Sequence, residues 1–165
     1  MSDKEYNQIV DMYIDMVYRL ALSYTKSCHD ANDVVQDVFL KLYTKAPAFE
    51  DELHLKRWLM RVTINACKNL WNSYWWKNTE GIDDYANQLL TQDEEASDLY
   101  MAVMELPKKY RICIHLFYFE DYSTREMAEL LHEKESTVRM RLVRGRKLLK
   151  QRLKEAWFDE ESGEV

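Results

Sequence analysis

The sequence predicts an all-α protein made of two small helical modules joined by an acidic linker. The chain has only three glycines and two prolines in 165 residues, too few for the many reversals of a β-sheet. Apolar residues form 47% of the chain and recur at helical spacing in several segments. Residues 79–105 hold eight acidic and no basic residues, which separates two basic blocks.

Residues 1–77 contain three amphipathic segments, which can enclose one small core. In the first, about residues 4–26, the expected buried positions are Ile9, Met12, Tyr13, Met16, Val17, Leu20, Ala21 and Tyr24. In the second, about residues 31–45 with Asp30 as N-cap, they are Val34, Val35, Val38, Phe39, Leu42 and Tyr43. In the third, about residues 53–75, they are Leu55, Trp58, Leu59, Val62, Ala66 and Leu70. Pro47 ends the second helix, because its ring disfavours a helical residue before it.

Residues 78–97 are expected to form a partly disordered linker, and residues 98–157 a second module followed by an acidic tail at 158–165. A short helix runs to Glu105, and Pro107 opens the next, whose apolar set is Ile112, Ile114, Leu116, Phe117 and Phe119. Ser123 and Glu126 can form a capping box for a short helix that buries Met127, Ala128, Leu130 and Leu131. After a turn at 132–134, the last helix runs from about Ser136 to Ala156.

This last helix is the strongest functional signal, because it carries eight basic residues and no acid before Glu155. A short capped helix, a tight turn and a basic helix are typical of a helix-turn-helix, whose second helix enters the DNA major groove. The residues expected at the DNA are Ser136, Thr137, Arg139, Arg141, Arg144 and Lys147. A solvated basic helix or a membrane-surface helix is the alternative, but its apolar side is already used by the core, which leaves none for lipid.

Four segments resemble the sigma-70-type factors of bacterial RNA polymerase. Residues 106–111 (LPKKYR) and 118–149 (YFEDYSTREMAELLHEKESTVRMRLVRGRKLL) are similar to region 4. Residues 30–43 (DANDVVQDVFLKLY) resemble region 2.2, and residues 56–65 (KRWLMRVTIN) resemble regions 2.3 and 2.4. The chain has no room for regions 1.1 and 3. This reduced plan resembles that of the extracytoplasmic-function (ECF) sigma factors.

The resemblance implies a role for each segment. Region 2.2 of the family binds the β′ clamp helices of core polymerase, which implies contacts by Asp33, Gln36, Asp37 and Lys41. An ordinary solvated helix face is the alternative for these four. The end of region 2 holds the −10 element single-stranded, which implies contacts by Arg61, Asn65, Lys68, Asn69 and Trp75. Region 4 would read the −35 duplex with the six residues of the last helix. The implied partners are core polymerase (β′ clamp helices and β flap), promoter DNA and an anti-sigma factor.

The chain departs from the family at the helix-turn-helix turn, where His132 stands in place of the usual glycine. Glu133 and Lys134 replace an apolar residue and a helix cap, and Glu135 places a negative charge near DNA. The basic run after region 2.4 is thin, with aromatic residues instead, so strand opening is expected to depend more on stacking. The acidic linker is either a solvated loop or a charge that keeps the DNA-binding faces off DNA until a partner arrives.

No phosphate-binding loop, zinc-protease motif or nucleophile elbow occurs in the sequence, so no catalytic site, metal or cofactor is expected. The polar N-terminus, the absence of a long apolar run and three scattered cysteines favour a reduced cytoplasmic protein without membrane insertion. We therefore expect a non-enzymatic ECF-type sigma factor. The alternatives are a stand-alone helix-turn-helix regulator and an interaction protein that only titrates a partner.

Overall fold

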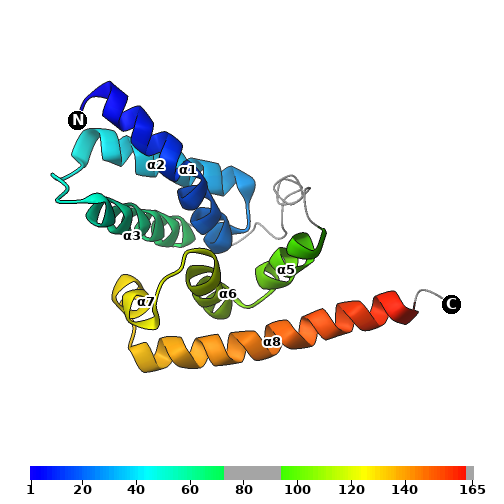
Figure 1. Ribbon diagram of the computed structural model, residues 1–165. Coiled ribbons are helices and arrows are strands. Elements are labelled where there is room, and N and C mark those ends of the chain that lie inside the picture. Colours follow the sequence, from blue (N-terminus) through cyan, green and yellow to red (C-terminus); the bar gives the residue numbers. More distant parts are fainter. Residues whose placement is uncertain (73–93, 163–165) are drawn as a thin grey trace. The chain divides into compact units, whose positions relative to one another are not determined.

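The computed structural model describes residues 1–72 and 94–162 (Figure 1). Every element in these ranges is a helix, which confirms the all-α expectation. The contacts divide the chain into two compact units, Met1–Asp84 and Tyr85–Val165.

Unit 1 contains α1 (Asp3–Thr25), α2 (Cys28–Lys45) and α3 (Glu52–Trp71), which pack against one another (Figure 1). Each helix is preceded by a polar side chain that accepts a hydrogen bond from a backbone N–H of the first turn. The N–H groups of a first turn have no partner within the helix, so such a cap stabilises the helix. Ser2 and Glu5 form a complete capping box on α1. Ser27, rather than the expected Asp30, caps α2, so α2 begins at Cys28. A serine oxygen is as good a cap as a carboxylate, which sequence alone could not distinguish.

The core of unit 1 lies where the three helices meet. Its fully buried side chains include Val17, Leu20, Val38, Leu42, Leu59 and Ile64. Two expected core residues are exposed instead, namely Met12 and Tyr43, the latter with 62% of its surface accessible. Both lie at the edge of a helix stripe. Met12 lines an open pocket between α1 and α3, and Tyr43 lines an open groove between α1 and α2, where its ring contacts that of Tyr6 edge-on at 5.2 Å.

Unit 2 contains α5 (Glu94–Met104), α6 (Lys108–Ile114), the π-helical turn η2 (His115–Phe119), α7 (Thr124–Leu131) and α8 (Glu135–Ser162). The long helix α8 packs along α5, α6 and α7 (Figure 1). Gly145 permits the close approach of α8 to α6, because a Cβ there would lie 3.1 Å from Ile114 Cγ1. The core holds Met104, Leu106, Ile114, Leu116, Met127, Val138 and Leu142.

Two helices of unit 2 are longer than the sequence predicts. Helix α5 begins at Glu94, inside the expected linker. Helix α8 continues past the expected end at Ala156 to Ser162, because the sequence has no glycine or proline between Ala156 and Gly163. None of the described helices is long and apolar enough to cross a bilayer.

Candidate nucleic-acid interface

Helices α7 and α8 form a helix-turn-helix in unit 2. Ser123 Oγ accepts the N–H of Glu126 at 3.1 Å and starts α7. Helix α7 ends at His132, which adopts the left-handed conformation with φ 55° and ψ 42°. Its N–H and that of Glu133 both bond to the Ala128 carbonyl, which closes the turn. His132 therefore takes the left-handed backbone conformation that favours glycine.

The apolar side of the motif fixes α8 against the rest of unit 2. Val138 and Leu142 of α8 are buried with Met127 and Leu130 of α7. The opposite side of α8 is left for solvent or a ligand. The predicted −35 residues that are exposed are Ser136, Arg139, Arg144 and Lys147. Thr137 and Arg141 are half-buried.

Two of the predicted base-reading arginines are held by acids of the motif. Arg139 Nη2 lies 2.7 Å from Glu135 Oε1, one helical turn before it. The same Glu135 oxygen accepts the hydroxyl of Thr124 at 2.9 Å, which ties the start of α8 to α7. Arg141 Nη2 lies 3.2 Å from Glu133 Oε1 in the turn. The residues that depart from the family pattern thus orient the arginines next to them.

Arg146, which sequence analysis did not include, lies further along α8. Its Nε donates to the Tyr118 hydroxyl at 2.6 Å, and its guanidinium stands over the rings of Phe117 and Tyr118. These contacts turn Arg146 toward η2. The only sequence signal was its place in the basic run, which could not tell a DNA contact from a packing contact.

In unit 1, α3 presents a polar face that includes four of the five predicted −10 residues. Arg61, Asn65, Lys68 and Asn69 are exposed and lie on one side of the helix, since they are spaced by about one turn. Arg57, one turn before Arg61, extends this face and was not singled out from the sequence. Trp75 lies outside the described residues.

The predicted polymerase-binding residues lie on the outer face of α2. Asp33 and Gln36 are exposed, whereas Asp37 and Lys41 are half-buried and pair at 2.9 Å. Beside them a shallow groove of about 510 Å³ runs between α1 and α2. It is lined by Gln36 and by apolar residues, among them the exposed Leu40 and Tyr43. The sequence prediction included only the polar residues of this face.

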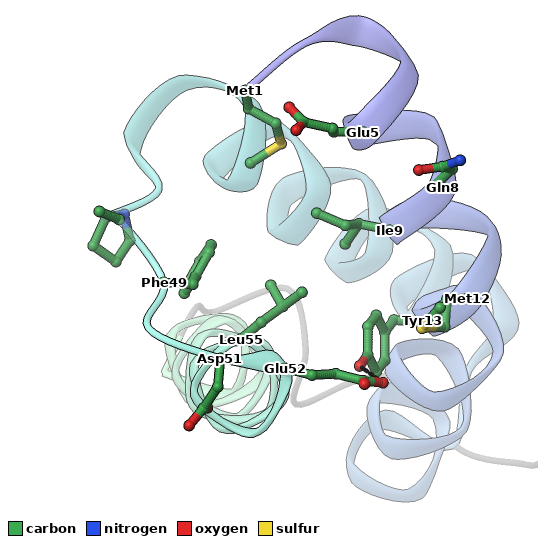
Figure 2. A pocket seen from close by; sticks show the side chains of 12 residues that line it. Met1, Glu5, Gln8, Ile9, Met12, Tyr13, Phe49, Asp51, Glu52 and Leu55 are labelled. Atoms are coloured by element: carbon green, nitrogen blue, oxygen red, sulfur yellow. Dashed lines mark hydrogen bonds between the residues drawn. The ribbon is translucent and has the colours of Figure 1, made fainter.

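A second pocket of about 500 Å³ lies between the first half of α1 and the start of α3. Figure 2 shows Ile9 of α1 facing Phe49 and Leu55 across it. At one side Tyr13 donates its hydroxyl to Glu52 Oε1 at 2.9 Å. Burial, with that hydrogen bond, raises the pKa of Tyr13 to about 12.

Comparison with known proteins agrees with this geometry. Residues 9–77 match the family model of sigma-70 region 2, and residues 96–149 match that of sigma-70 region 4. The ECF RNA polymerase sigma factor SigW of Bacillus subtilis (strain 168) is 29% identical over 89% of this chain and 88% of its own length. The RNA polymerase sigma factor SigV of the same organism is 31% identical, with 81% of each chain covered.

Two solved structures have a similar fold. One is the sigma factor RpoE of Bartonella quintana in complex with the anti-sigma factor NepR, with a TM-score of 0.68 and 20% identity over 92% of this chain and 98% of that chain. The other is CnrH in complex with the cytosolic domain of CnrY, with a TM-score of 0.67 and 22% identity over 93% of this chain and 90% of that chain. The two region matches together cover most of the chain, and the relatives match over most of their own length. This chain therefore belongs to the sigma-70 family, as an ECF sigma factor of RNA polymerase.

Proposed function

We propose that this protein binds core RNA polymerase and directs promoter recognition, opening of the −10 strands and transcription initiation. In this proposal residues 1–77 bind the core enzyme and the −10 strand, and residues 98–157 bind the −35 duplex. Residues 78–97 link the two modules. The protein itself performs no catalysis, because the polymerase carries out the chemistry in the cytoplasm.

One observation carries the proposal. Each of the two units presents an exposed helix face suited to nucleic acid, α3 with Arg61, Asn65 and Lys68, and α8 with Arg139 and Lys147. Basic side chains bind phosphates, and amide and guanidinium groups read base edges. Two weak DNA contacts become a strong one when a larger enzyme holds both units at once, since the second contact is then made at high effective concentration.

The outer face of α2 is the proposed contact with the β′ clamp helices. Asp33, Gln36 and Asp37 offer acceptors and donors there, and the neighbouring groove offers apolar surface. In unit 2 we assign the β flap as the second polymerase contact. Because one structural neighbour is a sigma factor in complex with an anti-sigma factor, we also propose an anti-sigma factor as regulator.

The test is run-off transcription from a library of bacterial genomic fragments, with purified core polymerase and the full chain. We expect discrete transcripts that core polymerase alone does not make. Core plus this protein initiating no more specifically than core alone would refute the proposal. Tight, sequence-specific DNA binding without polymerase would instead favour a stand-alone regulator.

A further inference from the structure

The outward side of α8 can be read from the burial pattern of the helix. Val138, Leu142 and Gly145 point to the core of unit 2. With 3.6 residues per turn, the positions opposite to them are 136, 140, 143 and 147. All four are exposed, and they are occupied by Ser136, Met140, Val143 and Lys147. The middle of the face that would enter the major groove is thus apolar.

Met140 and Val143 are unusual residues for that place. They are 45% and 49% exposed, although the helix around them is otherwise strongly basic. Being three residues apart, they are neighbours on the helix surface and form one small apolar patch. Neither residue lines the groove beside Tyr118, which lies further along α8.

Arg139 and Arg141, which flank this apolar patch, are drawn away from the outward side of α8. Arg139 is drawn back toward Glu135 by its ion pair, and Arg141 toward Glu133. The side chain of Arg141 is only 24% exposed. A DNA duplex that met the outward side of α8 would therefore meet Met140 and Val143 between flanking cations.

We propose that Met140 and Val143 are specificity-determining residues that contact thymine methyl groups in the −35 duplex. This inference rests on the proposed function of α8 as the −35 recognition helix. Neither side chain carries a hydrogen-bond donor, so neither can bind phosphate or read guanine as an arginine does. Neither carries a strong acceptor, so neither can read the amino group of cytosine as a carboxylate does. The C5-methyl of thymine is the one apolar group that the major groove presents, and apolar side chains contact it.

The experiment uses holoenzyme reconstituted from core polymerase and the full chain. Promoter duplexes randomised over the −35 element are selected for binding, and each enriched thymine is then replaced by uracil. That exchange removes one methyl group and leaves every hydrogen-bonding group in place. We expect at least one uracil to weaken wild-type binding about fourfold, as the loss of one buried methyl predicts.

Met140→Ala and Val143→Ala are expected to reduce this thymine-to-uracil difference to less than twofold at the matching position. Leu99→Ala is the matched control, because Leu99 is a similarly exposed apolar residue on α5. It should leave the difference unchanged. Val143→Thr keeps the shape of the side chain while replacing one of its two methyl groups by a hydroxyl, and should also reduce the difference.

Selection of a −35 sequence in which no thymine is sensitive to uracil would overturn this inference and leave the proposed function intact. So would a uracil effect that both alanine variants retain. If the holoenzyme enriches no duplex sequence at all, the proposed function fails together with the inference.

Discussion

Glu133 in the turn of the helix-turn-helix forms an ion pair with Arg141 on the recognition helix, with 3.2 Å between Oε1 and Nη2. Arg141 also lies near the buried thiol of Cys113 on α6; burial raises the pKa of this thiol, and the positive charge of Arg141 partly offsets that rise. One arginine thus connects α6, the turn and α8. The acid that departs from the family pattern holds a cation at the edge of the DNA-binding face.

Replacing Glu133 by Gln is expected to release Arg141 toward DNA. Because the Glu133–Arg141 ion pair is partly exposed, it contributes at most about 1 kcal/mol to the free energy of unfolding, so the fold should persist. Binding of holoenzyme to promoter duplex should become more salt-dependent, with the slope of log K against log salt steeper by about 0.9 for one added phosphate contact. Glu129→Gln is the control, because Glu129 on α7 pairs with Arg125 and not with α8. Equal slopes for the two variants would contradict the release of Arg141.

Arg139→Ala is expected to weaken −35 binding by about 1–3 kcal/mol and to relax base preference at one position, as the loss of a guanine contact does. The measurement is competition between promoter duplexes that differ at single −35 positions. Arg152→Ala is the control, since Arg152 lies far along α8 and pairs at 3.1 Å with Glu105, which follows α5. Unchanged promoter selection by the Arg139 variant would count against its place at a base.

The double change Gln36→Ala with Asp37→Ala should weaken binding to core polymerase at least tenfold without unfolding unit 1. These side chains lie on the outer face of α2, and the change also removes the Asp37–Lys41 ion pair. An affinity pull-down with core polymerase checks this, and circular dichroism checks the fold. Asp11→Ala, on the exposed side of α1, should bind normally. Full binding by the double variant would remove α2 from the polymerase interface.

Asn65→Ala should impair strand opening more than closed-complex formation. Asn65 is exposed in the middle of the polar face of α3, where an amide can hydrogen-bond an unpaired base. Permanganate reactivity of −10 thymines reports the opening, and Asn32→Ala on α2 serves as control. Reactivity equal to that of the wild type would take Asn65 off the −10 site.

His132→Gly should stabilise unit 2 by about 1 kcal/mol, because a non-glycine residue in the left-handed conformation costs about 1–2 kcal/mol. Denaturant unfolding measures the change in free energy of unfolding. Ala128→Gly, inside α7 and with ordinary helical backbone, should have the opposite sign. If His132→Gly instead lowers the free energy of unfolding, the imidazole makes a contact that stabilises the fold by more than the backbone strain costs.

Much of the site could be predicted because its signals are local. The cap at Ser123 and the unbroken basic run of α8 depend on residues a few positions apart, so the sequence predicts both the helix-turn-helix and its basic face. The exposed patch at Met140 and Val143 was not predicted. Helical periodicity in the sequence identifies the apolar residues that face the core, and it does not identify apolar residues on the opposite, polar side of the helix.

By itself, the sequence determined the helices, the cap at Ser123 and the sorting of charge into blocks, since backbone hydrogen bonding and side-chain periodicity act within a few residues. The tertiary structure decided which flank of each helix is covered, and therefore that Met12 and Tyr43 are exposed. It also decided that Arg141 pairs with Glu133 across the turn and that His132 adopts a left-handed backbone. Those outcomes depend on how the helices pack. Packing brings together residues from different helices, and the number of residues between them in the sequence does not determine how close they lie in space.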